Sequence, residues 1–336
     1  MAYLNGLSFY VPKNRLTNAD INRDFPEWSI DKISAKTGIE ERRIAGKDEF
    51  TSDMAVSAAE GFFNDYPEIE RSTIDFLLLC TQSPDYFLPS TSCIVQDRLG
   101  LPKTCGALDF NLGCSGYVYG LGLAKGLVAS GQAKRVLLIT AESYSRFVGN
   151  TDKSSKTIFG DGASASLVSA EKKGYAIGDF TYGTDGGGYD KLIVKEGGMR
   201  QRIPTDTVVK DNYGNERTEA DLYMDGQAVF VFTLGSVPRL VRNTMKKNAT
   251  DLSSVNLFVF HQANQFMLEH LRKKIKIDPE RFVVAMKNYG NTVSATIPIA
   301  LRTAMNDGRV SAGDTVLLAG FGVGLSVAGT VLTKVD

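Results

Sequence analysis

Short apolar runs rich in Val, Ile, Leu and Phe recur along the chain, and polar or glycine-rich stretches separate them. Runs of this kind are typical of strands that are buried on both faces of a sheet. The clearest are IDFLLLC (74–80), RVLLIT (135–140), VNLFVF (255–260) and DTVLLA (314–319). Segments with helical patterns lie between them, at 115–130 and 295–305. The alternation predicts an α/β protein.

The order of these elements occurs twice. In the first half FLLLC is followed by NLGCSGYVYGL and ASGQAKRVLLI, and in the second half LFVF is followed by NYGNTVSATIP and NDGRVSAGDTVLLA. We therefore expect two similar halves, residues 1–175 and 176–336, that bring Cys114 and Asn291 to a shared centre. The stretch 191–225 mixes charge and glycine with few periodic apolar positions, and we expect it to be an irregular insertion that caps the site.

Length and composition are those of an ordinary globular protein. The 336 residues suffice for two fused halves, and 38 basic side chains balance 38 acidic ones, which gives no sign of nucleic-acid or membrane-surface binding. The uncharged run 315–332 approaches the length of a membrane span, but its four glycines favour two buried strands around a loop. The first residues show no signal-peptide pattern, so we expect a cytoplasmic protein.

The candidate metal ligands have the wrong spacing for a metal site. No Cys-x-x-Cys pair occurs and the two histidines are nine residues apart. These residues are Cys80, Cys93, Cys105, Cys114, His261 and His270. We expect no bound metal and no resident cofactor, and we interpret Cys80, Cys93 and Cys105 as ordinary free cysteines.

Cys114 lies in a glycine-rich turn just before a predicted helix. The positive end of a helix and its free N–H groups lower the pKa of a nearby thiol, so Cys114 is a candidate nucleophile. A buried core cysteine is the alternative. The helix itself contains Gly116, Gly120, Gly122 and Gly126, and we expect close packing against another backbone to compensate for their low helix propensity.

Two further residues could complete a site with Cys114. His261 follows the strand LFVF, at the end where open α/β sheets place their ligands, although it could instead be a satisfied buried side chain. Asn291 takes the place of Cys114 in the second half, although an asparagine here could simply cap a helix. The loop GFGVG (320–324) has no following helix, so its glycines suit a bare backbone whose N–H groups face an oxyanion.

Taken together, the motifs NLGCSGYVYGL, HQANQ, NYGNTVSA, FGDGASA and GFGVGLSVAG resemble those of the β-ketoacyl-acyl carrier protein synthase III family of the thiolase superfamily. The resemblance implies a five-layered αβαβα fold and a homodimer. It implies that Cys114 is acylated by a thioester primer, which then condenses with malonyl-acyl carrier protein after decarboxylation. His261 and Asn291 would bind the malonyl thioester carbonyl, and the N–H groups of Cys114 and Val323 would form the oxyanion hole.

The resemblance also implies how the carrier is held. Carrier protein or coenzyme A would contact Lys36, Lys153, Gln262, Asn264 and Phe266, and entrance cations at Lys36, Arg42, Arg43, Lys153 and Lys273 would attract the carrier. Some positions depart from the family pattern: Lys32 occupies the place of a tryptophan, with Trp28 nearby, and Phe266 that of an arginine. The primer could therefore arrive on coenzyme A or on a carrier protein, in primary fatty acid synthesis or in a specialised pathway.

Three other functions are compatible with parts of the pattern. Within the family, an acyltransferase would move the acyl group to a hydroxyl or an amine instead of condensing it. Papain-like hydrolases use Cys, His and Asn in the same chain order, but the internal repeat argues against that class. A catalytically idle scaffold is disfavoured by the presence of all three residues.

Overall fold

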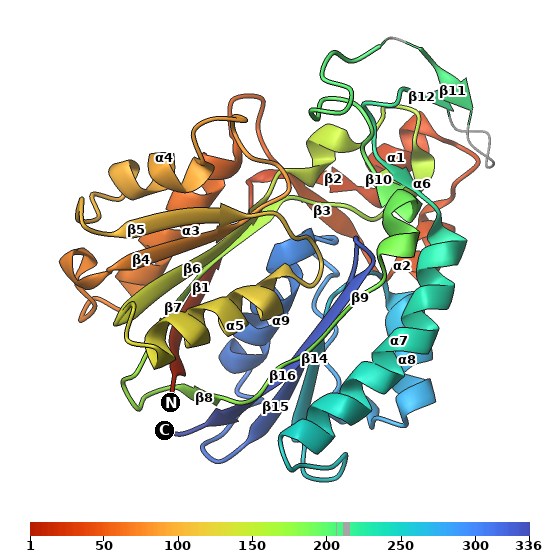
Figure 1. Cartoon of the computed structure of the whole chain (residues 1–336). Coiled ribbons are helices and arrows are strands. Elements are labelled where there is room, and N and C mark those ends of the chain that lie inside the picture. Colours follow the sequence, from red (N-terminus) through yellow and green to blue (C-terminus); the bar gives the residue numbers. More distant parts are fainter. Residues whose placement is uncertain (206, 211–215) are drawn as a thin grey trace.

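The computed structural model describes residues 1–205, 207–210 and 216–336 (Figure 1). Within these residues, ten strands form one mixed sheet. Nine of them follow one another in the spatial order β14 (Leu257–Phe260), β15 (Thr315–Gly322), β16 (Ser326–Lys334), β8 (Tyr175–Ile177), β1 (Tyr3–Tyr10), β7 (Gly162–Ser169), β6 (Arg135–Glu142), β4 (Phe76–Cys80) and β5 (Gly106–Phe110). The tenth, β9 (Thr181–Thr184), pairs with β16.

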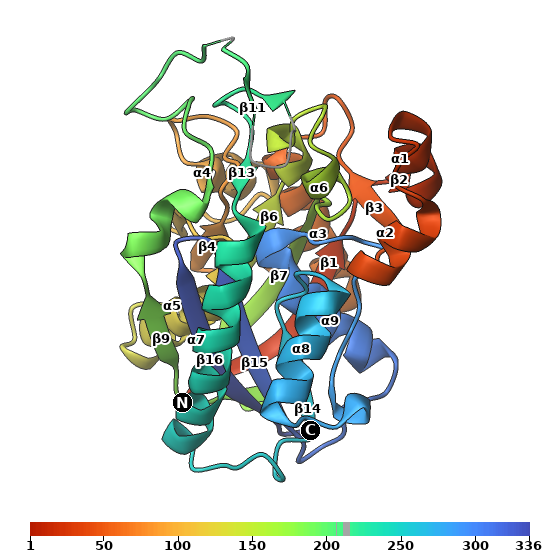
Figure 2. The same ribbon diagram turned by 90° about the vertical axis from the view of Figure 1, so that its right-hand side faces the viewer.

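The sheet has two parts that pack on either side of an inner pair of helices, and further helices cover the two outer faces. Together these form five layers. Helices α3 (Thr51–Asp65) and α4 (Thr91–Arg98) cover the outer face of the part that contains β1 and β4 to β7. Helices α5 (Gly116–Ala129) and α9 (Thr296–Asn306) contact both parts and lie between them (Figure 1). Helices α7 (Gly226–Lys247) and α8 (Gln265–Ile275) cover the outer face of β14 to β16 (Figure 2). The expected αβαβα layering is confirmed.

The smaller elements gather at one end of the molecule, near the ends of β4, β6 and β14 that lead into the site (Figure 2). Among the described residues they are β2 (Asn14–Thr17), α1 (Asn18–Asp24), α2 (Ile30–Thr37), β3 (Glu41–Ile44), α6 (Lys153–Lys156), β10 (Leu192–Ile193), β11 (Val209–Lys210), β12 (Glu216–Arg217) and β13 (Tyr223–Met224), with 3-10 turns at Tyr144–Phe147, Gly186–Lys191 and Val293–Ala295. The 3-10 turns Arg71–Thr73 and Pro279–Arg281 lie instead near the starts of β4 and β14. The predicted insertion 191–225 supplies β10 to β13, and its residues 206 and 211–215 lie outside the described residues.

The strands predicted from sequence are present. The runs at 74–80 and 135–140 form the parallel pair β4 and β6, and the runs at 255–260 and 314–319 form the parallel pair β14 and β15. The uncharged run 315–332 forms β15 and most of β16, as expected. Each pair is joined through a polar turn and an inner helix, α5 or α9. The division between residues 175 and 176 stays a prediction.

We expected the glycines of α5 to pack against another backbone. They pack against side chains instead. A Cβ atom on Gly116 would lie 2.3 Å from Cys80 Sγ, and one on Gly120 would lie 2.6 Å from Leu138 Cδ1. Gly122 meets the hydroxyl of Tyr182, whereas nothing lies within 4 Å of the same position on Gly126. The missing methyl groups let α5 lie deep between the two parts of the sheet.

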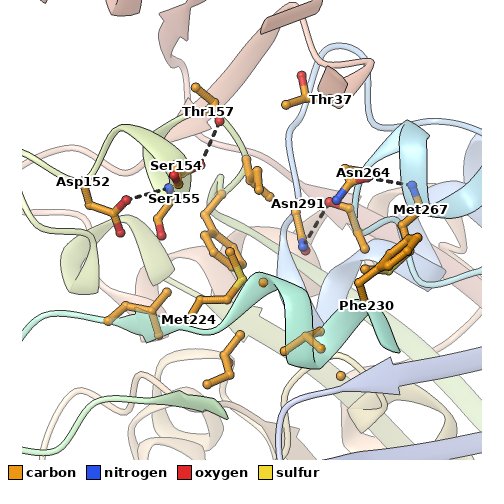
Figure 3. A pocket seen from close by; sticks show the side chains of 18 of the residues that line it. Thr37, Asp152, Ser154, Ser155, Thr157, Met224, Phe230, Asn264, Met267 and Asn291 are labelled. Atoms are coloured by element: carbon orange, nitrogen blue, oxygen red, sulfur yellow. Dashed lines mark hydrogen bonds between the residues drawn. The ribbon is translucent and has the colours of Figure 1, made fainter. Parts of the chain in front are cut away.

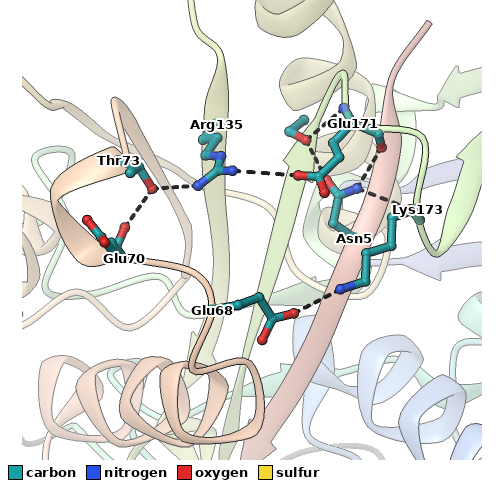
Figure 4. Close-up of polar contacts among 8 residues, drawn as sticks. Asn5, Glu68, Glu70, Thr73, Arg135, Glu171 and Lys173 are labelled. Atoms are coloured by element: carbon teal, nitrogen blue, oxygen red, sulfur yellow. Dashed lines mark hydrogen bonds and ion pairs between the residues drawn. The ribbon is translucent and has the colours of Figure 1, made fainter.

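Polar contacts fasten the surface where β1, β6 and the chain after β7 meet (Figure 4). Lys173 pairs with Glu68 at 2.8 Å, and Arg135 pairs with Glu171 at 3.5 Å. The side-chain amide of Asn5 donates to the carbonyl of Glu171 at 2.8 Å. Exposed ion pairs of this kind are each worth only about 0–1 kcal/mol, so the apolar layers supply most of the stability.

None of the helices in the described part of the chain is both long enough and apolar enough to span a lipid bilayer.

Candidate active site

Cys114 lies in the tight turn that leads into α5 and is buried, with 8% of its surface exposed. Strand β15 runs directly beside this turn. A Cβ atom on Gly322 would lie 2.6 Å from Cys114 Sγ, and one on Gly320 would lie 2.7 Å from the Cα atom of Ser115. The glycines at 320 and 322 therefore allow the backbone of β15 to approach the sulfur, while the predicted oxyanion hole stays a prediction.

The environment of Cys114 changes its pKa in the direction opposite to the expectation. Burial raises the pKa of the thiol to about 12, and the N–H groups of Val323 and of Cys114 itself, which face the sulfur, offset only part of this. The loss of hydration outweighs the favourable dipoles because a thiolate in a closed site loses its water shell. The side chain of Cys114 is therefore a neutral thiol in the free protein. The backbone N–H groups of Cys114 and Val323 both face its sulfur.

His261 is held at the end of β14 by its backbone and by its ring. Its N–H donates to the carbonyl of Ala319 at 2.9 Å, and its Nδ1 atom lies 2.7 Å from the hydroxyl of Thr296. The hydroxyl of Thr296 also contacts the carbonyl of Val293 at 2.9 Å. Burial lowers the pKa of His261 to about 3, so the ring is neutral. The Thr296 hydroxyl has one hydrogen: if it donates to Nδ1 the ring proton is on Nε2, and if it donates to Val293 the ring proton is on Nδ1. Donation from Nε2 to a substrate therefore requires the first arrangement.

Asn291 is fixed by backbone pairing and by a strained turn. Its N–H donates to the carbonyl of Ile158 at 2.8 Å, and its carbonyl accepts from Gly160 at 3.0 Å, so the start of the FGDGASA motif pairs with Asn291. Its Oδ1 atom accepts from the N–H of Val293 at 2.9 Å. Val293 has a φ of 54°, which is unusual for a β-branched residue. The side-chain N–H₂ of Asn291, whose closest acceptor is the Ala263 carbonyl at 3.5 Å, remains available to a substrate.

One cavity of about 620 Å³ brings the predicted catalytic residues together. Figure 3 shows part of its lining, with Asn291 beside Asn264 and Met267. Cys114, His261, Asn291 and Val323 all line it. Much of its wall is apolar and comes from the cap segment, from α7 and from α8: Leu192, Leu222, Met224, Val229, Phe230 and Met267. Neutral donors and a thiol that open into an apolar cavity suit a long, uncharged substrate arm.

Of the five predicted carrier-contacting residues, four line the cavity and Gln262 does not. Lys36, Lys153, Asn264 and Phe266 border it. Gln262 is 2% exposed, its amide nitrogen donates to the carbonyl of Phe260 at 2.7 Å, and its Oε1 atom accepts from Ala285 at 2.8 Å. Its side chain therefore fastens the end of β14 to the chain near residue 285.

The entrance contains fewer free cations than expected. Arg42 is fully buried and donates to Asn18 and to the carbonyl of Thr157, so it is a structural residue and not an entrance charge. Arg43 pairs with Glu41 at 3.0 Å. Lys153 pairs with Glu27, and Lys36 lies 5.4 Å from the ring of Trp28.

Three residues near the catalytic groups were not identified from the sequence: Thr296, Tyr144 and Glu142. Thr296 holds His261, and Tyr144 lines the cavity beside Cys114. Glu142 is a fully buried acidic residue at the end of β6. A charged residue closing the apolar strand RVLLITAE was a signal that could have identified Glu142; Thr296 and Tyr144 had no comparable signal. Among the described residues, no cluster of three His, Cys, Asp or Glu side chains could hold a metal.

The layered sheet and a cavity that joins a cysteine, a histidine and an asparagine define the class as a thiolase-fold enzyme. Family models for 3-oxoacyl-[acyl-carrier-protein] synthase III and for its C-terminal part match residues 108–186 and 245–334. Beta-ketoacyl-[acyl-carrier-protein] synthase III 2 of Halalkalibacterium halodurans is 36% identical, over 98% of this chain and 96% of that protein.

Solved structures agree with these sequence comparisons. A crystal structure of a 3-oxoacyl-(acyl-carrier-protein) synthase III is 46% identical, covers 99% of both chains and superposes with a TM-score of 0.96. The corresponding synthase III of Thermus thermophilus is 34% identical over 98% of both chains, with a TM-score of 0.87. The chain belongs to the 3-oxoacyl-[acyl-carrier-protein] synthase III family.

Proposed function

We propose that the protein condenses an acyl primer, held as a thioester on Cys114, with malonyl-acyl carrier protein, and that it serves fatty acid or related acyl-chain synthesis. The observation that carries the proposal is the single cavity lined by Cys114, His261, Asn291 and Val323. The family relationship supports the same reaction.

The first half-reaction is acyl transfer to Cys114. The sulfur attacks the carbonyl carbon of the primer thioester, the carbon–sulfur bond to the carrier breaks, and the thiol proton passes to the leaving carrier thiol. Because the thiol pKa is raised, proton removal accompanies the attack. The N–H groups of Cys114 and Val323 face the sulfur and are placed to stabilise the negative oxygen of the tetrahedral intermediate.

The second half-reaction forms the carbon–carbon bond. The bond between the malonyl carboxylate and C2 breaks, CO₂ leaves, and the electron pair passes into an enolate of the carrier thioester. C2 then attacks the acyl carbon on Cys114, and the cysteine thiolate leaves and regains a proton. A neutral His261 and the amide of Asn291 stabilise the enolate oxygen by hydrogen bonding, and decarboxylation removes the need for a strong base.

The carrier arm enters beside α2, α6 and α8 in this proposal. Lys36 attracts the phosphate of a phosphopantetheine arm, and Lys153 does so by exchanging its partner Glu27 for the phosphate, while Asn264 and Phe266 border the same opening. The steps use only side chains and substrates, so the reaction needs no resident cofactor. The choice between coenzyme A and carrier protein as the primer's carrier, and a cytoplasmic location, stay predictions.

We also propose a homodimer formed through β5. This strand is the edge of the ten-stranded sheet, and its Leu108 is 48% exposed. The adjacent loop presents Tyr86, Phe87 and Leu88, which are 63%, 67% and 86% exposed. The N–H groups of Thr91 and Ser92, at the start of α4 just after this loop, donate to the side-chain carboxylate of Asp109 on β5. An open edge beside apolar side chains suits a second copy paired by a twofold axis.

Intact-mass measurements test the proposal. Incubation with a panel of acyl-coenzyme A and acyl-carrier thioesters is expected to add one acyl group to the protein and none to Cys114→Ala. His261→Ala and Asn291→Ala should still be acylated but should lose CO₂ release from malonyl-acyl carrier protein. An adduct on another residue would refute the nucleophile, and normal condensation by either variant would refute the second step. Transfer of the acyl group to a hydroxyl or an amine would favour the acyltransferase alternative.

A further inference from the structure

Glu142 is the last residue of β6 and lies directly behind the catalytic residues, with none of its surface exposed. Its carboxyl accepts hydrogen bonds from the hydroxyl of Ser294 at 2.7 Å, from the N–H of Gln82 at 3.0 Å and from the hydroxyl of Ser83 at 3.3 Å. Ser294 belongs to the second half of the chain, and the other two partners belong to the first. A single side chain therefore joins the two halves next to the site.

The partner from the second half is part of the turn that orients Asn291. Ser294 follows Val293, whose N–H holds the side-chain oxygen of Asn291. The backbone at Val293 has a positive φ, an arrangement that persists only when its surroundings hold it in place. The hydrogen bond from Ser294 to Glu142 is one of those restraints.

One partner from the first half, Gln82, lies against the Cys114 turn. The side chain of Gln82 donates to Asn111 at 3.1 Å, and a Cβ atom on Gly113 would lie 2.4 Å from its Oε1 atom. Glu142 thus connects the loop that supports Cys114 to the turn that presents Asn291.

No positive charge offsets this carboxyl. Among the described residues, no lysine, arginine or histidine forms an ion pair with Glu142, and the titratable groups that face it are Cys80, Cys114, Tyr144 and Asp161. Burial without a partner charge is costly and favours the neutral acid. In the neutral state the carboxyl donates its one O–H to one of the two serine hydroxyls and accepts from the other hydroxyl and from the N–H of Gln82, so it joins three partners without a buried charge.

We propose that Glu142 is a positioning residue for the condensation, whose carboxyl holds the Asn291 turn against the loop that supports Cys114. The inference rests on the proposed function and assigns the residue to the decarboxylation step, because its shortest hydrogen bond is to the Asn291 turn. Cys114 is also held by α5 and by the glycines of β15, so acylation depends less on Glu142.

The test measures both half-reactions on the same samples: acyl adduct formation on Cys114, and CO₂ release from malonyl-acyl carrier protein. Their ratio does not change when part of a sample is unfolded. In Glu142→Ala and Ser294→Ala, decarboxylation relative to acylation should fall by about tenfold or more, since small displacements of an oriented group cost factors of this size. Glu142→Gln should restore the ratio, because its amide keeps both an acceptor and donors.

Ser169→Ala serves as the matched control. Ser169 is equally buried and bonded to Asn5 at 2.7 Å, at the far end of β7, so its loss should leave the ratio unchanged. An unchanged ratio in Glu142→Ala and Ser294→Ala, with an active parent enzyme, would overturn the role of Glu142 alone. A parent enzyme that performs neither half-reaction would overturn the proposed function and this inference together.

Discussion

At the scale of single residues, the space around the Cys114 sulfur depends on one missing methyl group. A Cβ atom on Gly322 would lie 2.6 Å from Sγ, well inside van der Waals contact. Gly322→Ala should therefore slow acylation of Cys114 by about 100-fold or more. The rate of adduct formation by mass spectrometry checks this.

Gly126→Ala is the control for that substitution. Nothing lies within 4 Å of a Cβ atom on Gly126, so the variant should keep its acylation rate. It should also gain about 0.5–1 kcal/mol in free energy of unfolding through better helix propensity. Normal acylation of Gly322→Ala would contradict the described packing.

The Thr296 hydroxyl is the side-chain partner of the Nδ1 atom of His261. Thr296→Val keeps the shape but removes this hydrogen bond at a buried nitrogen, which should cost about 1–3 kcal/mol of stability. Decarboxylation should fall more than acylation because the ring loses its orientation. Thr296→Ser keeps the hydroxyl and should behave like the parent enzyme; equal behaviour of the Val variant would refute the role of Thr296.

The sequence predicted the residues that form recognisable motifs and missed those whose partners are distant in the chain. Cys114, His261, Asn291 and Val323 were predicted and share one cavity. The contact of Glu142 with Ser294 spans 152 residues and has no local pattern. The same limit explains the wrong prediction of Arg42 as an entrance cation. Arg42 is buried through its hydrogen bonds with Asn18 and Thr157, and Thr157 is distant from it in the chain.

At the scale of elements, the short turn Tyr144–Phe147 forms part of the compartment beside Cys114. Tyr144 packs there with Phe159, Leu192 and Leu222, and its hydroxyl donates to Gln82 at 3.2 Å. Removing the ring in Tyr144→Ala should enlarge the compartment and shift the acyl adducts toward longer chains. Competition between acyl-coenzyme A species of different length, read by intact mass, measures the shift.

Phe147→Ala provides the comparison. Phe147 packs edge-on against Tyr144, with the two ring centroids 5.6 Å apart, but it does not line the cavity. Loss of its ring should therefore leave the chain-length preference unchanged. A similar shift in both variants would indicate general loosening. An unchanged profile in Tyr144→Ala would contradict the assignment of the compartment.

The long elements were predictable from hydrophobic pattern because burial on both faces leaves continuous apolar runs. The inner helices were expected at 115–130 and 295–305, and they span Gly116–Ala129 and Thr296–Asn306. Short elements such as β8, which joins the two parts of the sheet, carry too few residues to show a period. Their formation depends on tertiary pairing.

At the scale of the whole molecule, the buried Glu142 makes stability depend on pH. Burial raises its pKa to about 8, from 4.5 in the unfolded chain. The folded state therefore binds an extra proton between these values, and the resulting stabilisation is present below about pH 4.5 and lost as the pH rises through about 8. Between pH 5 and 9 the parent enzyme should lose roughly a few kcal/mol relative to Glu142→Gln.

Urea unfolding of both proteins across this range measures the difference. A constant difference would show that Glu142 does not titrate in this window. His261 affects stability in the opposite direction, because burial lowers its pKa to about 3. Its contribution to the free energy of unfolding is present above about pH 6.5 and is lost as the pH falls toward 3. His261 is present in both proteins, so its effect cancels.

The proposed dimer predicts a specific response to charge at the open sheet edge. Leu108→Asp places a carboxylate on β5 and should convert a dimer to a monomer, as measured by light scattering after size exclusion. Val231→Asp, on α7, introduces the same charge at a residue that is 64% exposed and away from that edge, and should leave the mass unchanged. A dimer that persists in Leu108→Asp would refute β5 as the interface.

The central claim is that Cys114 carries an acyl group that is joined to a decarboxylated malonyl unit. A single-turnover experiment tests it most directly: the acylated protein is isolated, mixed with malonyl-acyl carrier protein, and both proteins are weighed by intact mass spectrometry. We expect the adduct to leave Cys114, CO₂ to be released, and the carrier to gain the acyl group in place of the lost CO₂. Loss of the adduct as free acid, with the malonyl-acyl carrier protein unchanged, would contradict this claim.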